Sequence, residues 1–404
     1  MSYLLDAYTS LKKVYSDNKY LTDVVSSIGD SNDKALITRI VYGVVERDVT
    51  LEYILSKLVT KSPKSQVKLI LKIGLYCLKY MDSLPDYSVC DNCVKLTKQI
   101  GKSSLAGFVN ATLKASITKD IPLPENTLER LSVTTSTPLW IVKKVVKQYG
   151  DRAEKILNFT PTTLTHIRRN SLKFDKLDFE REFSDSLSDL GGAFVKVDGK
   201  VKELFSDGKI TFQSPESMKI VSLCIKKDCG KILDVCSAPG GKSVYLAELT
   251  GSKVTAFDLH PHRVELIKKY ASRMGVDVDA RVQDGTVFVP SYSEIFDIVL
   301  VDAPCSGIGV RYSKPDVLLN RQEKDIVELN AIQQSLLDNS CRYVKTGGVL
   351  VYSTCTIFEE ENERVVTRFL SAHPEFRVDS EYMKVTPGVN GGEGFFAVRL
   401  RRVI

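Results

Sequence analysis

The sequence predicts an α/β protein with a doubly wound parallel sheet, preceded by an all-helical region and a small α+β region. Three observations support this fold class. From residue 213 onward, runs of Val, Ile and Leu alternate with amphipathic stretches, a pattern typical of parallel strands covered by helices on both faces. Before residue 125, apolar residues recur at helical spacing. Between these regions, short alternating runs indicate a mixed module.

These changes of pattern divide the 404 residues into three predicted domains, a number that a chain of this length can accommodate. Residues 1–125 form the helical domain. Residues 126–212 comprise a linker and the small α+β subdomain, and residues 213–404 form the α/β domain. The stretch 120–140 is rich in Pro, Ser and Thr, as expected of a link between domains.

The N-terminal domain is predicted from apolar stripes separated by turns such as "TKSPKS" and "DSLPDYS". The stripes lie in "ALITRIVYGVVERDVTLEYILSKLV", "VKLILKIGLYCLKYM" and "SLAGFVNATLKASI", and we expect them to form a packed core. Cys90 and Cys93 form a C-x-x-C on a predicted helix, but no second pair follows at metal-site spacing. We therefore expect ordinary buried thiols there.

The parallel sheet is predicted from five runs that read "KILDVCS", "KVTAFDL", "DARVQD", "FDIVLVDAP" and "GGVLVYSTC". Helical stretches such as "KSVYLAELTG" and "HRVELIKKYASRMG" lie between them. Ligands of such sheets bind beyond the carboxyl ends of the strands. The residues that follow each strand are therefore the candidate site.

Composition excludes several classes of protein. Nine cysteines, an odd number scattered along the chain, do not form a secreted disulfide framework. No apolar run approaches the roughly 20 residues of a membrane helix, and the N-terminus lacks the features of a signal peptide. We expect a cytoplasmic protein, monomeric by default and without a membrane partner. The net charge of +6 permits nucleic-acid binding without arguing for it.

The first strand leads into a glycine-rich turn, but the dinucleotide and P-loop glycine patterns are absent, which disfavours a nicotinamide or a nucleoside triphosphate. Asp258 ends the second strand, where an acid can accept hydrogen bonds from ribose hydroxyls. Asp284 ends the third, within reach of an adenine amine. Either acid alone reads equally well as a solvated loop carboxylate; together with the turn they suit S-adenosylmethionine. The predicted cofactor residues of these strands and loops are Cys236, Ser237, Ala238, Pro239, Gly240, Gly241, Lys242, Asp258 and Asp284.

Two cysteines end strands at the same predicted rim, Cys305 in "VDAPCSGIGV" and Cys355 in "VYSTCT". With "DVCSAPGGK" and the "EENE" that follows "YSTCT", these motifs resemble the Sun/RsmB family of RNA (cytosine-5)-methyltransferases. The resemblance covers the whole chain: "RIVYGVVERDVTLEYIL", "PDYSV" and "GFVNATLK" resemble that family's NusB-like helical domain, and "IRRNSLK" resembles its Arg-x-Asn element. It implies a Rossmann-like S-adenosylmethionine methyltransferase domain, an RNA-binding NusB-like domain and small-subunit ribosomal RNA as substrate.

The chemistry explains the need for two thiols. A thiolate that adds to carbon 6 of cytosine makes carbon 5 able to accept a methyl group, and loss of the carbon 5 proton then calls for a base. The residues alone do not order the two thiols; the resemblance implies attack by Cys355 and release by Cys305. Asp302 is expected to hydrogen-bond the flipped cytosine, and the family also places it near the cofactor. No metal is expected.

Other polar residues leave alternatives open. Arg168, Arg169 and Arg311 are predicted RNA contacts, with solvated surface charge as the alternative. Lys242 has three candidate partners: a cofactor carboxylate, an RNA phosphate or Asp302. Glu359 replaces a proline usual in the family, and we expect no loss of activity because Glu also suits the start of a helix.

Three other functions remain open at this point. The same chemistry could act on tRNA or large-subunit rRNA, although the helical front disfavours this. A non-catalytic NusB-like RNA-binding assembly factor would not need both cysteines and the acids. A redox protein that pairs Cys305 with Cys355 would leave the cofactor motifs unexplained.

Overall fold

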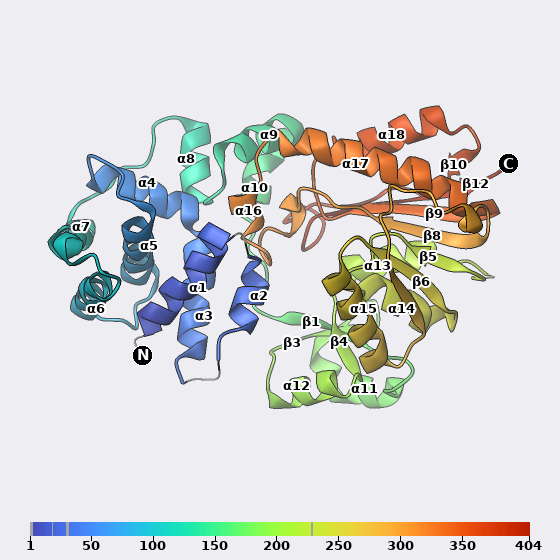
Figure 1. Ribbon diagram of the computed structural model, residues 1–404, viewed down its shortest axis with the longest axis horizontal. Coiled ribbons are helices and arrows are strands. Elements are labelled where there is room, and N and C mark those ends of the chain that lie inside the picture. Colours follow the sequence, from blue (N-terminus) through green and yellow to red (C-terminus); the bar gives the residue numbers. More distant parts are fainter. Residues whose placement is uncertain (1–2, 18, 30–31, 228) are drawn as a thin grey trace. The chain divides into compact units, whose positions relative to one another are not determined.

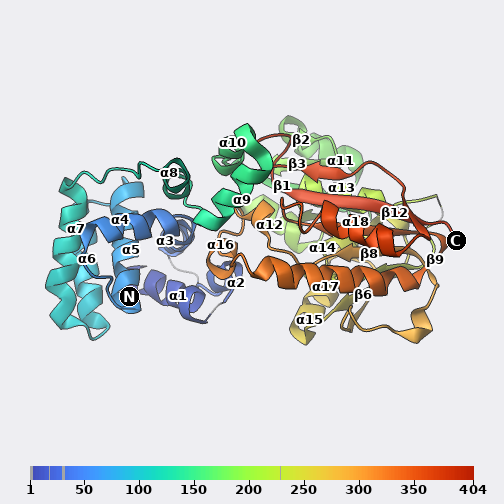
Figure 2. The same ribbon diagram turned by 90° about the horizontal axis from the view of Figure 1, so that it is seen from above.

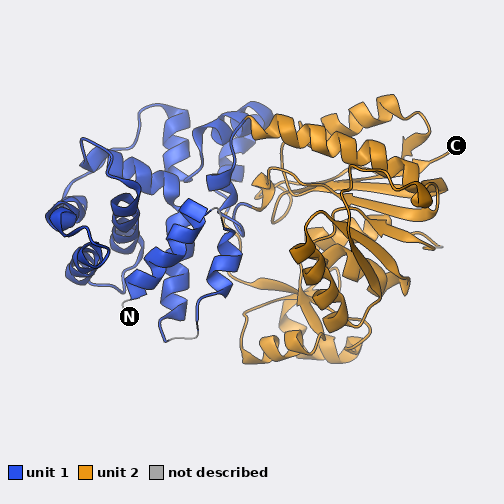
Figure 3. Ribbon diagram, viewed as in Figure 1, with its two compact units in different colours: residues 1–159, 311–323 blue, residues 160–310, 324–404 orange. Residues whose placement is uncertain are grey.

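The structure is a computed structural model that describes residues 3–17, 19–29, 32–227 and 229–404. The chain forms two compact units, shown in different colours in Figure 3. The first comprises Met1–Phe159 with Arg311–Glu323, and the second comprises Thr160–Val310 with Lys324–Ile404.

The first unit is helical in the part that is described (Figure 1). Its apolar stripes meet in one core, in which α5 packs against α1, α3, α4, α6 and α7. Cys90 and Cys93 are buried on α6, as predicted. The helices are α1 (Tyr3–Asp17), α2 (Leu21–Ser26), α3 (Lys34–Glu46), α4 (Asp48–Leu58), α5 (Ser65–Tyr80), α6 (Asp86–Gln99), α7 (Ala106–Thr118), α8 (Thr127–Thr134), α9 (Leu139–Tyr149), α10 (Ala153–Leu157) and α16 (Val317–Asn320).

The second unit begins with a small antiparallel sheet of order β2-β3-β1-β4. Ile167 on the central strand β1 packs with Phe179 and Ile210 to form a core of its own. The elements are β1 (Thr165–Arg169), α11 (Lys176–Glu182), β2 (Leu187–Ser188), β3 (Gly192–Val195), α12 (Gly199–Ser206) and β4 (Ile210–Phe212).

The large sheet of the second unit has the order β10-β12-β9-β8-β5-β6-β7, and β11 pairs with β12. Strands β5 to β9 are parallel, as predicted, whereas β10, β11 and β12 add an antiparallel edge that the sequence patterns did not reveal. The strands are β5 (Ile232–Asp234), β6 (Val254–Asp258), β7 (Val278–Val282), β8 (Phe296–Asp302), β9 (Val344–Thr354), β10 (Phe376–Val378), β11 (Met383–Val385) and β12 (Phe395–Arg402).

Helices cover both faces of this sheet (Figure 1), and Figure 2 shows the same layers from above. Ile298 and Leu300 of β8 pack with α13 and α14 on one face. Val299 and Val301 pack with α17 and α18 on the other, because alternate residues of a strand point to opposite faces. The helices are α13 (Pro215–Cys224), α14 (Gly241–Thr250), α15 (Pro261–Met274), α17 (Asp325–Ser340) and α18 (Glu363–Ala372).

The strand order positions the site. From β5 the chain proceeds outward through β6 and β7 and then returns to β8 on the other side of β5. Such a switch point opens a crevice at the carboxyl ends of the two central strands. The predicted thiols and acids lie at this end of the sheet. Within the described residues, no helix combines the length and the apolar character needed to cross a membrane.

Candidate active site

The loop between β5 and α14 is held in a conformation that requires glycine. Gly240 has φ +108°, and its amide donates to the carbonyl of Ser237 at 2.7 Å. A Cβ at this position would lie 3.3 Å from Cα of Ile267 on α15. Ser243 on the first turn of α14 donates to Oδ2 of Asp234 at 2.5 Å and so ties the helix to β5. The glycine turn therefore carries the backbone close to neighbouring elements.

The two predicted acids follow the neighbouring strands β6 and β7. Asp258 is buried, and it accepts hydrogen bonds from the amides of His260 at 3.1 Å and Ala238 at 3.4 Å. Asp284 is partly exposed, and its Oδ1 accepts from the amide and hydroxyl of Thr286 at 2.9 and 2.7 Å. The bond to Ala238 joins the acid of β6 directly to the glycine-rich loop.

Carboxylates surround this loop. Burial raises the pKa of the Cys236 thiol, and the charges of Asp234, Asp302, Asp258 and Asp284 raise it further. Such a set of acids attracts a positive charge, and S-adenosylmethionine carries a sulfonium and an ammonium group. The chemistry of these residues therefore fits that cofactor.

Lys242 lies at the start of α14 and pairs with an acid at the end of β8. Its Nζ donates to Oδ2 of Asp302 at 2.6 Å, and Ser353 donates to Oδ1 of the same carboxylate at 2.7 Å. Burial disfavours the ammonium, but the charge of Asp302 and the hydrogen bond outweigh this and raise the pKa of Lys242. Of the three partners predicted for Lys242, Asp302 is the one that it contacts in the structure.

The two thiols meet at the ends of adjacent parallel strands. Asp302 on β8 is in register with Ser353 on β9, so the residues that follow these positions lie side by side. The sulfur atoms of Cys305 and Cys355 are 3.3 Å apart, and the Cys355 amide donates to the Cys305 sulfur at 3.3 Å. A disulfide bond would need about 2.05 Å, so the two sulfur atoms are not joined by one. Cys305 is buried and Cys355 is partly exposed.

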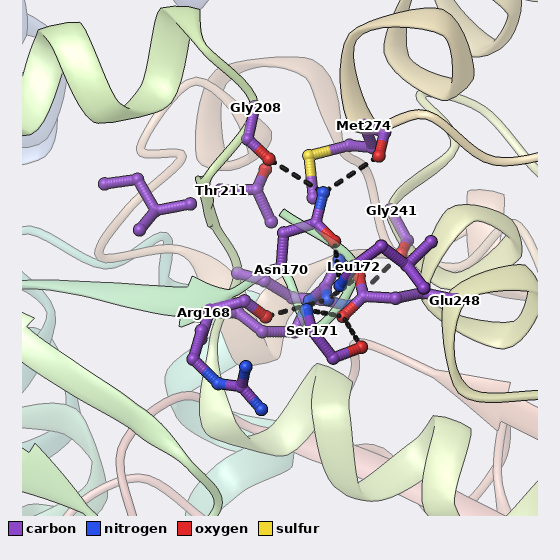
Figure 4. Close-up of polar contacts among 12 residues, drawn as sticks. Arg168, Asn170, Ser171, Leu172, Gly208, Thr211, Gly241, Glu248 and Met274 are labelled. Carbon is purple, nitrogen blue, oxygen red and sulfur yellow. Dashed lines mark hydrogen bonds and ion pairs between the residues drawn. The ribbon is translucent and has the colours of Figure 1, made fainter. Parts of the chain in front are cut away.

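The Arg-x-Asn element joins the small sheet to the large one (Figure 4). Arg168 is 1% exposed; it pairs with Glu248 on α14 and donates through Nε to Gln213 at 2.7 Å. Asn170 donates to the carbonyls of Gly208 and Met274 at 2.7 and 2.8 Å. These bonds give both residues a structural role.

The other predicted RNA contacts are also engaged within the protein. Arg169 donates to the carbonyl of Phe174 at 2.5 Å. Arg311, in the first unit, is buried and donates to the carbonyl of Leu157 at 2.6 Å and to Thr137. Their contact with RNA, like that of Arg168, stays a prediction.

One group with metal-ligand chemistry occurs among the described residues, formed by Cys341, His373 and Glu375. Cys341 belongs to the short turn that leads into β9, so the group lies at the opposite end of this strand from Cys355. The His373 ring nitrogens are 3.2 Å from Glu375 and 3.0 Å from Asp338.

Sequence reasoning missed the polar residues behind the thiols. Ser353 supports Asp302, and Glu361 is fully buried and bonded to Ser306. "EENE" contributes to the family resemblance, but nothing in the pattern distinguishes a buried glutamate from a solvated one.

Comparison with known proteins identifies relatives of this chain. Residues 222–401 match the family model described as 16S rRNA methyltransferase RsmB/F, and residues 4–118 match the NusB family. The "Probable ribosomal RNA small subunit methyltransferase B" of Bacillus subtilis is 33% identical, over 98% of each chain. The "Ribosomal RNA small subunit methyltransferase B" of Photorhabdus laumondii is 27% identical, over 97% of each chain.

Solved structures share the fold. The crystal structure of PH0851 matches with a TM-score of 0.84 at 24% identity, over 98% of this chain and 97% of that one. The crystal structure of NSun6 from Pyrococcus horikoshii with SFG matches with a TM-score of 0.57 at 20% identity, over 66% of this chain and 98% of that one. The predicted fold class is thereby confirmed, a NusB-type helical domain with a Rossmann-like methyltransferase domain. The near full-length match to the Bacillus subtilis protein and the two family models show that the chain belongs to the RsmB/F family of S-adenosylmethionine-dependent 16S rRNA methyltransferases.

Proposed function

We propose that the enzyme methylates carbon 5 of a cytosine in small-subunit ribosomal RNA through a covalent adduct on Cys355. One observation carries the proposal: the sulfur atoms of Cys305 and Cys355 lie 3.3 Å apart at the rim that also holds the Lys242–Asp302 pair. Methylation of carbon 5 needs a nucleophile and a proton acceptor at one pyrimidine ring, and two adjacent thiols meet that need.

The steps follow from the two thiols. When bound, S-adenosylmethionine supplies an electrophilic methyl group. The Cys355 thiolate forms a bond to carbon 6, and the ring electrons become available at carbon 5 for that methyl group. Cys305, which has by then released its own proton to solvent, accepts the carbon 5 proton as a thiolate. The electrons left behind restore the double bond between carbons 5 and 6 and expel the Cys355 thiolate.

The electrostatics support this division of roles. The hydrogen bond with Cys355 and burial raise the pKa of the Cys305 thiol, and the negative charge of a Cys355 thiolate adds to the effect. Once Cys355 is bonded to carbon 6, its sulfur is neutral and these effects of Cys355 end, so Cys305 can release its proton to solvent and then accept the carbon 5 proton. The ammonium of Lys242, in contrast, interacts favourably with a negative charge on Cys355. A stabilised thiolate suits a group that must attack and later leave.

The remaining residues take roles in binding. We assign the cofactor ribose to Asp258, the adenine amine to Asp284, and the rest of the cofactor to the loop from Cys236 to Lys242. Asp302 lies between this loop and the thiols, so its carboxylate serves both the cofactor side and the cytosine side of the site. No step needs a metal, because the Cys355 thiolate activates the ring.

The substrate follows from the family and from the chemistry. Curated relatives are named for the ribosomal RNA small subunit, which supports 16S rRNA over tRNA or large-subunit rRNA and supports a cytoplasmic location. A paired and stacked cytosine does not expose carbon 6, so we expect the target in an accessible loop or flipped out of its helix. We propose that the enzyme is a monomer, which is the simplest oligomeric state.

Nucleoside analysis tests the proposal. The protein is incubated with 16S rRNA and methyl-labelled S-adenosylmethionine, and the RNA is digested to nucleosides and separated. We expect labelled 5-methylcytidine from the wild type and from Cys229→Ala, which removes a partly exposed thiol outside the site, and none from Cys355→Ala. Label in another nucleoside, or transfer only to tRNA or 23S rRNA, would contradict the proposal.

A further inference from the structure

A fully buried carboxylate lies behind the Cys305 loop. Glu361 belongs to the turn before α18 and is 0% exposed. Its Oε1 accepts hydrogen bonds from the Ser306 amide at 2.7 Å and from Nε2 of Gln333 at 3.2 Å, and its Oε2 accepts from the Ser306 hydroxyl at 2.6 Å. Because Ser306 directly follows Cys305, Glu361 holds this loop through two bonds to one residue.

The same group of bonds extends to the Cys355 loop. The hydroxyl oxygens of Ser306 and Thr356 are 2.8 Å apart, and Thr356 directly follows Cys355. Gln333 on α17 also donates to the carbonyl of Pro304 at 3.0 Å, on the other side of Cys305. Both thiol loops are therefore connected to Glu361 through one or two hydrogen bonds.

The backbone around Glu361 is fixed as well. The hydroxyl of Tyr352 donates to the Glu361 carbonyl at 2.6 Å. The neighbouring Asn362 donates to the carbonyl of Thr356 at 3.0 Å and accepts from Thr354 at 2.5 Å, so it contacts the residue on each side of Cys355. The carboxylate thus projects from a rigid support.

Burying a carboxylate is costly unless hydrogen bonds replace its water. Burial raises the pKa of Glu361, and the bonds from Ser306 and Gln333 oppose that rise. The hydrogen bonds of the carboxylate go to the residues beside the thiols, so its effect on the sulfur atoms is transmitted through the two loops.

We propose that Glu361 is a positioning residue that sets the placement of the Cys305 and Cys355 sulfur atoms relative to each other by holding both loops. The inference rests on the proposed function, in which both thiols must reach one cytosine. It predicts that loss of Glu361 impairs the chemical step while leaving substrate and cofactor binding intact.

Three variants separate position from charge. Glu361→Gln keeps the shape: its oxygen still accepts from the Ser306 amide, and its amide donates to the Ser306 hydroxyl, which then donates to Thr356. Glu361→Ala removes every acceptor and leaves buried donors unpaired. Glu359→Gln is the matched control, because Glu359 lies on the same turn with 42% of its side chain exposed and pairs with Arg364.

Steady-state kinetics give the first readout. We expect Glu361→Ala to lower kcat about 100-fold, the loss that a misplacement of about 1 Å can cause. KM for RNA and for S-adenosylmethionine should stay within about twofold. Glu361→Gln and Glu359→Gln should keep kcat within about threefold of the wild type.

Disulfide formation gives a second readout that needs neither RNA nor cofactor. The protein is treated with diamide, and closure of the Cys305–Cys355 disulfide is followed by mass spectrometry. The sulfur atoms are 3.3 Å apart, so we expect rapid closure in the wild type and in Glu361→Gln, and closure about tenfold slower in Glu361→Ala because the thiols are no longer held together.

The outcomes are distinct. Wild-type kcat and wild-type closure in Glu361→Ala would overturn the inference, as would Glu361→Gln as impaired as Glu361→Ala. Slower closure in Glu361→Ala with a wild type that makes no 5-methylcytidine would support the positioning role and refute the proposed function. If circular dichroism shows Glu361→Ala unfolded, Ser306→Ala replaces it, since it removes the hydroxyl that joins Glu361 to Thr356. Slower closure in Ser306→Ala supports the inference, and unchanged closure overturns it.

Discussion

Replacement of Gly240 by alanine tests whether the glycine turn forms the proposed cofactor site. At φ +108° and ψ 2°, the backbone lies beyond the left-handed region that other residues occasionally adopt. An alanine Cβ would also sit 3.3 Å from Cα and 3.4 Å from Cγ2 of Ile267. A residue held in such a backbone conformation costs about 1–3 kcal/mol. The crowding against α15 adds to this, so we expect the unfolding free energy to fall by about 3 kcal/mol.

Gly251→Ala is the matched control at the other end of α14. Gly251 has φ +63°, and a Cβ there would meet nothing within 4 Å, so the cost is about 1 kcal/mol of left-handed strain alone. Urea unfolding should show the loss of about 3 kcal/mol in Gly240→Ala and of about 1 kcal/mol in Gly251→Ala. Calorimetric titration with S-adenosylmethionine should show a Kd at least about tenfold higher in Gly240→Ala, about 1.4 kcal/mol, and unchanged in Gly251→Ala. Wild-type affinity in Gly240→Ala, or an equal loss in Gly251→Ala, would refute the reasoning.

Three further predictions concern buried charges. Lys242→Met leaves Asp302 without its cation, so we expect methyl transfer to fall at least about tenfold and urea unfolding to show a loss of about 2 kcal/mol; an unchanged rate would contradict the role of the pair. Burial raises the pKa of the Asp234 carboxyl to about 7, so the folded state binds the carboxyl proton more tightly than the unfolded chain does. Protonated Asp234 therefore adds to the free energy of unfolding below about pH 4. This contribution is lost as the pH rises through 7. The free energy of unfolding of Asp234→Asn, measured with urea, should therefore rise relative to that of the wild type by up to about 4 kcal/mol between pH 4 and 7. An equal dependence of the two free energies on pH would contradict this. Glu248→Gln leaves the Arg168 guanidinium buried beside a neutral partner and should cost about 3 kcal/mol in the same assay; a loss below about 0.5 kcal/mol would show that the pair is dispensable.

Much of the second unit could be predicted because strands that are buried on both faces appear in the sequence as continuous runs of apolar residues. The Val and Ile runs of β5 to β9 mark a parallel sheet, and the rule for ligand position then directs attention to Asp258, Asp302 and Cys355. The antiparallel strand β12 escaped prediction. Phe396, Val398 and Leu400 pack on the α17 face and Ala397 on the other, but this alternation does not reveal which neighbour the strand pairs with.

The polar residues behind the site could not be predicted for a different reason. In a sequence, Glu361 and Arg168 read as solvated charges, yet they are 0% and 1% exposed. Their partners come from distant parts of the chain: Glu361 bonds to Ser306, and Arg168 pairs with Glu248. Only the folded sheet brings these groups together, so burial and partner become visible at the same time. The order of the two thiols likewise needed the family resemblance.

The covalent intermediate is the central claim, and it can be trapped. Cys305→Ala should still add to the cytosine through Cys355 but should fail to release it, whereas Cys355→Ala should form no bond to RNA. Each variant is incubated with 16S rRNA and S-adenosylmethionine and then run on a denaturing gel. We predict a denaturation-resistant protein–RNA band for Cys305→Ala and none for Cys355→Ala. A band for Cys355→Ala, or methyl transfer by that variant at the normal rate, would contradict it.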